Sequence, residues 1–168
     1  RIDKEILKEF SEGLIGLSAC LKGEIPRLIL QNNFTEAQEL ALSYQEIFGK
    51  GNFYLELQTN TMLEQLKVNQ ELIKLSRSLQ IPLVATNDVH YINREDYEAH
   101  DILLCIQTAT TINDPDRLKF STDEFYFNTQ EEMQRHFADI PDPLENTLKI
   151  HQECTLELDF TKTYLPDF

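Results

Sequence analysis

Residues 82–91 read PLVATNDVHY, and this stretch indicates the fold more directly than any other part of the sequence. A short apolar run there ends abruptly in Asn87, Asp88 and His90. In α/β proteins, ligands gather beyond the carboxyl ends of buried strands. A carboxylate oxygen and an imidazole nitrogen both suit Zn²⁺, Mn²⁺ or Fe²⁺. The stretch therefore predicts a strand that delivers two candidate metal ligands, Asp88 and His90, whose companions must lie elsewhere.

Helices and strands alternate upstream of this stretch. Residues 13–20 and 52–58 are strand candidates, and each is followed by a region with apolar residues at helical spacing. Thr35 with Gln38, and Thr61 with Glu64, have the spacing of capping boxes at the starts of two helices. The expected buried faces are Ala37, Leu40, Ala41, Tyr44 and Phe48 in the first helix, and Val68, Leu72, Leu75 and Leu79 in the second.

This order of strand, helix, strand, helix, strand is typical of a parallel sheet or a β/α barrel. Two or three strands cannot close a barrel, so a chain of this length would hold only part of one. Two shorter helices are also expected near the start, over residues 2–12 and from about Glu24.

The sequence pattern changes after residue 91, where mainly helical segments follow the alternation of strands and helices. Asn93 is expected to cap a helix with Ala99, Ile102, Leu103 and Ile106 on one face. Residues 124–128 resemble a short strand, and residues 129–132 are expected to cap another helix, which runs through Phe137. A final helix is predicted over residues 141–154, with Leu144, Leu148 and His151 in register, before an irregular tail.

Length and composition favour one ordinary soluble domain. The chain has 168 residues, 41% of them hydrophobic, which is enough for a real core. No apolar run approaches the roughly 20 residues of a membrane helix, and no secretory leader is recognisable. The three cysteines form no C-x-x-C pair and are expected to be free thiols in a reducing cytoplasm. The start at Arg1 rather than Met suggests a piece of a longer chain.

The charge disfavours direct contact with nucleic acid. The net charge is −14, from 29 acidic and 15 basic residues, whereas affinity for phosphate backbones normally comes from Lys and Arg. We therefore expect this segment to bind DNA or RNA poorly, unless a basic partner domain or metal ions reverse the local sign.

Several blocks together resemble the alpha subunits of bacterial DNA polymerase III, the replicative DNA polymerases of the C family. They occur in the order of that family across nearly the whole chain. The blocks are GLIGLSACLKGEIP at residues 13–26, NFYLELQ at 52–58, VATNDVHY at 84–91 and AHDILLCIQT at 99–108, with shorter matches at 124–126, 131–133 and 146–147.

The resemblance implies a PHP (polymerase and histidinol phosphatase) domain. In the wider family this is a distorted seven-stranded β/α barrel with up to three metals at the strand ends. The opening His-x-His block would lie before Arg1. Residues 1–92 would then be the C-terminal part of the PHP domain, and residues 93–168 its helical end and the connection toward the polymerase palm. Zn or Mn would be expected in the intact PHP domain, and Mg in the palm of the parent polymerase.

Within the part that is present, Asp88 and His90 match the last metal-binding pair of the family, and Cys20 matches a position that contributes a ligand in some members. The simpler alternatives are that Asp88 and His90 cap a helix and bond one another, and that Cys20 is a small buried thiol. Asn60 departs from the family, because metal-binding members often place a His just after this strand. A neutral amide is a poor Zn²⁺ ligand, so Asn60 predicts a weakened or vestigial site.

Other polar and aromatic residues have structural interpretations. His100, beside Asp101, is expected to make a structural hydrogen bond. Glu56 is expected to be satisfied by backbone or by a basic neighbour. The aromatic cluster at residues 125–127 could stack on bases, but its acidic flanks favour core packing.

Three hypotheses of function follow. The first is a structural and interaction module of a DNA-directed DNA polymerase acting in chromosome replication, inactive on its own. The second is a metal-dependent phosphoesterase, a 3′–5′ exonuclease used in proofreading. The third is an unrelated acidic protein-binding domain. We favour the first. The implied partners are the remainder of the alpha chain, the proofreading subunit, the clamp and the clamp loader, with DNA bound through other domains.

Overall fold

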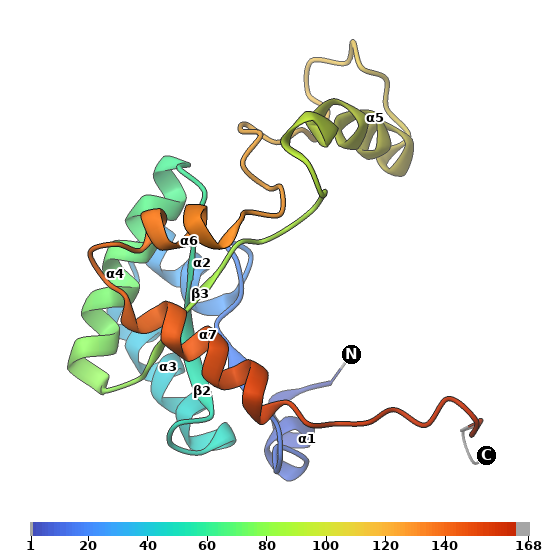
Figure 1. Cartoon of the computed structure of the whole chain (residues 1–168). Coiled ribbons are helices and arrows are strands. Elements are labelled where there is room, and N and C mark those ends of the chain that lie inside the picture. The colour runs from blue at the N-terminus through green and yellow to red at the C-terminus, as the bar shows by residue number, and fades with distance from the viewer. Residues whose placement is uncertain (1, 164–168) are drawn as a thin grey trace.

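The structure is a computed structural model that describes residues 2–163. It is a mixed α/β fold with a small parallel sheet and helices packed around it (Figure 1). Within the described residues, no helix is long and apolar enough to cross a membrane. The elements are α1 (Lys4–Glu9), β1 (Gly16–Leu17), α2 (Glu24–Leu30), α3 (Phe34–Phe48), β2 (Phe53–Gln58), α4 (Leu63–Leu79), β3 (Leu83–Thr86), η1 (Arg94–Asp96), α5 (Tyr97–Thr108), α6 (Gln130–His136) and α7 (Asp142–Glu153).

The three strands form one parallel sheet in the order β1-β2-β3. This confirms the predicted alternation of strands and helices, while the described residues form an open sheet and not a closed barrel. The first strand is much shorter than the predicted range 13–20. It pairs with β2 at Gly16 and Leu17, and the N–H groups of Gly16 and Ser18 donate to Asn52 O and Tyr54 O over 2.8 and 3.0 Å.

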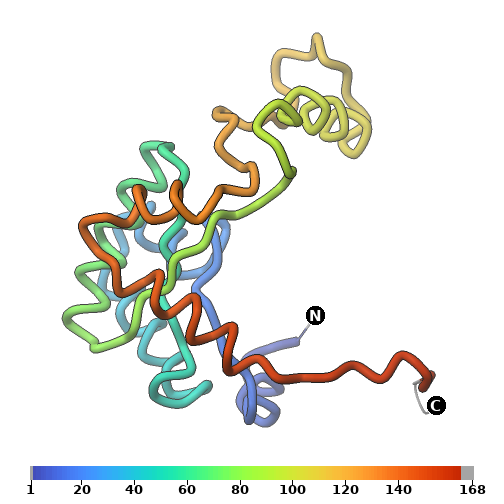
Figure 2. The backbone as a smooth tube through the Cα atoms, in the orientation of Figure 1, coloured from blue at the N-terminus to red at the C-terminus, as the bar shows by residue number. Residues whose placement is uncertain are grey.

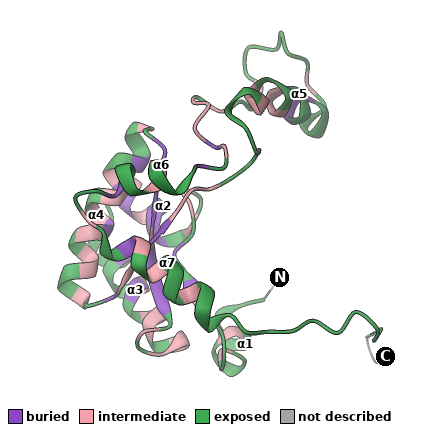
Figure 3. Ribbon diagram, in the orientation of Figure 1, coloured by how far each residue is buried: buried purple, intermediate pink, exposed green. Residues whose placement is uncertain are grey.

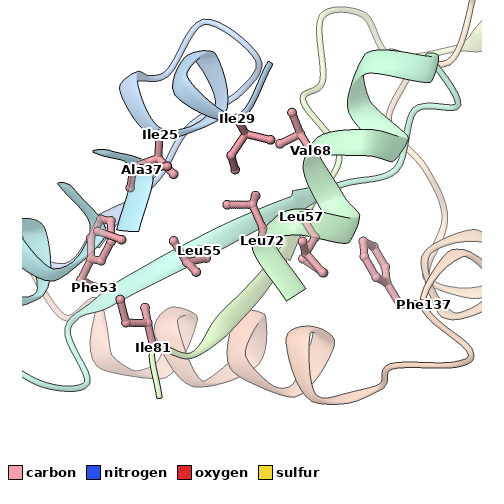
Figure 4. Packing of buried hydrophobic residues seen from close by; sticks show 12 residues of the cluster. Ile25, Ile29, Ala37, Phe53, Leu55, Leu57, Val68, Leu72, Ile81 and Phe137 are labelled. Carbon is pink, nitrogen blue, oxygen red and sulfur yellow. The ribbon is translucent and has the colours of Figure 1, made fainter. Parts of the chain in front are cut away.

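The core lies where β2 meets the helices (Figure 4). Leu55 and Leu57 of β2 are 0% and 1% exposed, and they share one apolar cluster with Val68 and Leu72 of α4. The predicted stripe of α3 also packs there, with Ala37 and Ala41 fully buried and the larger members partly buried. Apolar periodicity alone therefore identified the buried faces of α3 and α4.

One edge of the sheet is covered by side chains of α7. Asn146 Nδ2 donates to Leu83 O, and Thr147 Oγ1 donates to Ala85 O, both over 2.8 Å. Because Pro82 O accepts from Leu55 N–H on the β2 side, the carbonyls of Leu83 and Ala85 point to the opposite, outer edge of β3. The predicted final helix forms as α7, but Leu148, predicted in register with Leu144, is 64% exposed because α7 turns Asn146 and Thr147 to β3.

The helix starts show which local signals were overridden by tertiary contacts. The predicted cap at residues 129–132 forms at the start of α6 and is a capping box, in which Thr129 and Glu132 bond reciprocally. The one predicted at Thr61 is wrong, because Thr61 N–H and Oγ1 both donate to Glu124 Oε2, at 2.8 and 2.7 Å. The one predicted at Thr35 is also wrong. The chain turns tightly after α2, so α3 already begins at Phe34 and leaves Thr35 in its first turn.

Residues 92–124 form an arm that carries η1 and α5 away from the sheet (Figures 1 and 2). Asn93 caps η1, as expected for the start of this helical region. The predicted strand over residues 124–128 is reduced to a single parallel bridge between Tyr91 and Tyr126. The surface of the arm is largely exposed (Figure 3), and this includes the apolar face that the sequence predicts for α5.

Candidate functional site

A pocket of about 310 Å³ opens where the carboxyl ends of β2 and β3 meet the chain after β1 and the base of the arm. Cys20, Asp88 and His90, the three predicted ligands, all line it. Asn60 lines it as well, together with Gln58 and Gln65. The structure thus brings every sequence-predicted site residue to one cavity, as the rule for strand ends anticipates.

Asp88 and His90 are fixed largely by backbone geometry. Asp88 has a φ of 55°, in the left-handed region, which aspartate tolerates better than most residues. His90 N–H donates to Phe125 O over 2.8 Å. The His90 ring folds back so that Nδ1 lies 2.8 Å from Asp88 O. A carbonyl can only accept, so Nδ1 is the donor of this bond, and in the neutral form of the ring Nε2 is the acceptor nitrogen.

Of the simpler alternative, the hydrogen bond between Asp88 and His90 forms, through the main-chain carbonyl of Asp88, whereas the expected helix cap does not. The His90 ring nitrogen stands 3.9 Å from the nearest Asp88 carboxylate oxygen, beyond hydrogen-bond distance. Neither residue caps a helix in the described chain. A histidine that is anchored through one nitrogen to a carbonyl and keeps the other free has the orientation usual for a metal-ligating imidazole.

The outer wall behind His90 is aromatic. Its ring meets Phe120 and Phe125 edge to face, with centroids 4.9 and 5.3 Å apart, and His100 lies 5.7 Å away. Burial of the His100 ring, and then the neighbouring His90, lower the pKa of His100. The Nδ1 atom of His100 is buried without a hydrogen-bond partner among the described residues, so the structural hydrogen bond expected there is not made through that atom.

The inner wall consists of amides. Asn60 is 1% exposed, and neither its Oδ1 nor its Nδ2 has a hydrogen-bond partner within residues 2–163. The same holds for the Oε1 atoms of Gln58 and Gln65. Buried polar atoms are nearly always paired, so these three amides stand out among the polar groups that line the pocket. Sequence reasoning found Asn60 but missed Gln58 and Gln65. The alternation of polar residues at 56, 58 and 60 was the available signal for Gln58.

Glu56 is held by neutral donors and not by a basic side chain. Thr86 Oγ1 donates to Glu56 Oε1 over 2.5 Å, and Gln58 Nε2 lies 3.4 Å from the same oxygen. The expectation of a backbone or basic partner is therefore wrong. Neighbouring parallel strands place Thr86 directly beside Gln58 and close to Glu56, which no local pattern reveals.

The donor set at the pocket does not fit a metal cluster. In the described part of the chain, no three His, Cys, Asp or Glu side chains come close enough together to hold a metal ion. The pocket offers one carboxylate, one imidazole and one thiol, and its remaining buried polar groups are neutral amides. Zinc and manganese sites need several anionic or imidazole ligands around one point, and these residues alone do not supply them.

The first part of the chain matches a known domain family. Residues 1–60 match the PHP domain family. This stretch contains α1, β1, α2, α3 and β2, so two of the three strands, and Gln58 and Asn60 of the inner wall, lie in the part that matches this family.

Over its whole length the chain is similar to proteins named DNA polymerase III subunit alpha. It is 48% identical to the one from Borreliella burgdorferi over 100% of this chain and 15% of the relative. It is 46% identical to the Treponema pallidum protein over 99% of this chain and 14% of the relative, and 44% identical to the Thermus aquaticus protein over 94% and 13%. The chain belongs to the family of DNA polymerase III alpha subunits, and it spans about one seventh of the length of these relatives.

Proposed function

We propose that this chain is a structural and interaction module of a replicative DNA polymerase, and that DNA synthesis is carried out elsewhere in the longer polypeptide. The observation that carries the proposal is the amide-lined pocket. Where a metal-dependent phosphoesterase needs clustered carboxylates and imidazoles, this pocket presents Gln58, Asn60 and Gln65.

The charge supports the same assignment. A DNA-binding surface needs Lys and Arg to displace counterions, and this chain carries 29 acidic residues against 15 basic ones. DNA would therefore be contacted by other parts of the polymerase. In this proposal the three strands form part of the larger β/α barrel of a PHP domain. Residues 1–92 belong to that barrel, and residues 93–168 lead from it toward the catalytic palm.

The further partners and the location follow from this role as proposals. The remainder of the alpha chain is the first partner, and the proofreading subunit, the clamp and the clamp loader are the others. The setting is the bacterial cytoplasm. The palm, and not this chain, would use Mg²⁺ for nucleotide transfer.

A second candidate is a metal-dependent 3′–5′ exonuclease. It is favoured by the His90 ring, which is anchored through Nδ1 to Asp88 O and lines the pocket together with Asp88. Because the described residues lack a full ligand set, this activity would require further ligands from outside residues 2–163.

The complete polymerase separates the two candidates. Its metal content and its 3′-exonuclease rate are measured for the wild type, for Asp88→Ala and for the control Asp114→Ala, which alters an exposed loop of the arm. We expect all three proteins to extend a primer. We also expect Asp88→Ala to abolish no metal-dependent 3′ cleavage, so that its cleavage rate equals that of the wild type. Stoichiometric metal together with Asp88-dependent cleavage would establish the exonuclease and overturn the purely structural role. Incorporation of labelled dNTP by the 168-residue chain alone would contradict the placement of synthesis elsewhere.

A further inference from the structure

Helix α5 is apolar on two opposite faces. Leu104 and Cys105 are 7% and 6% exposed on its inner side. On its outer side, residues 99, 102, 103 and 106 recur at i, i+3, i+4 and i+7, and Ile102, Leu103 and Ile106 are 55%, 60% and 71% exposed. We call these four residues the α5 stripe. The inner residues are covered by the rest of the arm, whereas within residues 2–163 nothing covers the α5 stripe.

Side-chain contacts hold α5 against the loop that follows it in the arm. Asp101 and Arg117 form an ion pair with side chains only 14% and 9% exposed, and Arg117 Nη2 donates to Asp101 Oδ2 over 2.7 Å. Tyr97 Oη donates to Phe120 O over 3.0 Å. These contacts hold the inner face, so the α5 stripe is presented outward as a fixed surface. A fixed apolar surface is the usual form of a binding interface.

The charge around the α5 stripe restricts what can cover it. Glu98 is exposed on the same helix, α5 contains no Lys or Arg, and the nearby Arg94 is already paired with Asp123 over 2.7 Å. Such a border repels nucleic acid and anionic lipid. It also disfavours a second copy of this chain, whose net charge is −14. The complementary surface is apolar at its centre and has Lys or Arg at its rim.

We infer that the α5 stripe packs against another part of the same, longer polymerase polypeptide, on an apolar patch bordered by basic residues. The inference rests on the proposed function. The described chain is 13–15% of the length of its relatives, so most of the polypeptide that could cover the stripe lies outside it. A DNA polymerase must also carry basic surface, and that surface is not supplied by this acidic chain.

Cysteine labelling in the complete polymerase tests the inference. Leu103→Cys places a thiol on the α5 stripe, and Ser78→Cys places one on the exposed side of α4 as the matched control. Maleimide modification is followed at each site by peptide mass spectrometry, which separates these thiols from the native ones. Because buried sites react only through local opening, we expect labelling at Leu103→Cys to be roughly tenfold slower or more than at Ser78→Cys. Equal rates would overturn the inference.

Two further measurements identify the occupant. Slow labelling at Leu103→Cys that becomes fast when the polymerase is diluted from micromolar to nanomolar concentration would assign the α5 stripe to a second copy. That result would also overturn the inference. Slow labelling at Leu103→Cys that does not depend on protein concentration supports the inference. Failure of the wild-type protein to extend a primer would instead refute the proposed function, and that assay does not depend on the labelling rates.

A charge substitution gives an independent readout. In the complete protein, Leu103→Asp combined with Ile106→Asp is expected to lower the thermal midpoint, since two carboxylates would enter an apolar contact. The control Ser78→Asp leaves the midpoint unchanged. An unchanged midpoint in the double variant would contradict coverage of the stripe.

Discussion

One of the hydrogen bonds between α7 and the outer edge of β3 can be removed by replacing a single side-chain atom. Thr147→Val keeps the shape of the side chain and removes the hydroxyl that donates to Ala85 O over 2.8 Å. The same hydroxyl lies 3.1 Å from Pro143 O, but a hydroxyl has one proton and the shorter contact is the one to Ala85. Ala85 is 1% exposed, so water cannot readily replace the lost donor.

The expected cost follows from this burial. Leaving a buried carbonyl without a donor costs about 1–3 kcal/mol. For a chain of this size, each kcal/mol lowers the thermal midpoint by about 2–4 °C. We therefore expect the midpoint of Thr147→Val to fall by roughly 2–12 °C. The control Thr147→Ser keeps the donor and loses only a methyl group, so its midpoint stays closer to that of the wild type.

The assay is thermal and urea unfolding followed by circular dichroism. The slope of the urea transition is compared first, because an altered slope would mean that the unfolded or native ensemble had changed. If Thr147→Val unfolds at the same midpoint as Thr147→Ser, the hydroxyl does not stabilise the edge of β3 and the reasoning is refuted.

Other perturbations test the core, one close approach and one ion pair. Leu72→Ala, at a fully buried core position, should lower the free energy of unfolding by about 2–5 kcal/mol in urea titration. Gly16→Ala would place its Cβ 2.5 Å from the Phe48 ring, and we expect a loss of about 1–3 kcal/mol in the same titration. Arg117 holds the pKa of Asp101 below its usual value. The stabilisation from that pair is therefore present above the ordinary carboxyl pKa of about 4, and it is lost as the pH falls through the lowered pKa. In Arg117→Met, the Asp101 titration followed by NMR should move upward toward that ordinary value, and no movement would contradict the assignment.

Periodic patterns predicted the elements whose partners lie within the chain. The stripe from Ala37 to Phe48 and the pair Val68 and Leu72 pack on the sheet as their spacing indicates. The capping box at Thr129 forms because both of its residues are free to bond one another. Thr61 has the same local signal, but its hydroxyl is used by Glu124, 63 residues away. Local signals fail where a distant residue offers a stronger partner.

In the candidate site, too, some residues are predictable from the local sequence and others are not. Asp88 and His90 were predicted at the pocket because they follow a strand directly, and a strand end fixes where its next residues go. Gln65 was missed because it lies on a helix, where nothing in the local sequence says that its amide faces the pocket. The outward face of α5 is a different case. The apolar pattern was read correctly, while the surface that would cover it is not among the described residues.

The contact between α7 and β3 also has a consequence for folding during synthesis. An unpaired strand edge is a template for pairing with another chain, and Thr147 reaches Ala85 across 62 positions of sequence. A ribosome that adds about 5–20 residues per second leaves an interval of roughly 3–12 s between the synthesis of β3 and that of its cover. During each round of translation, the outer edge of β3 is therefore open to wrong partners until α7 has emerged from the ribosome and closed it.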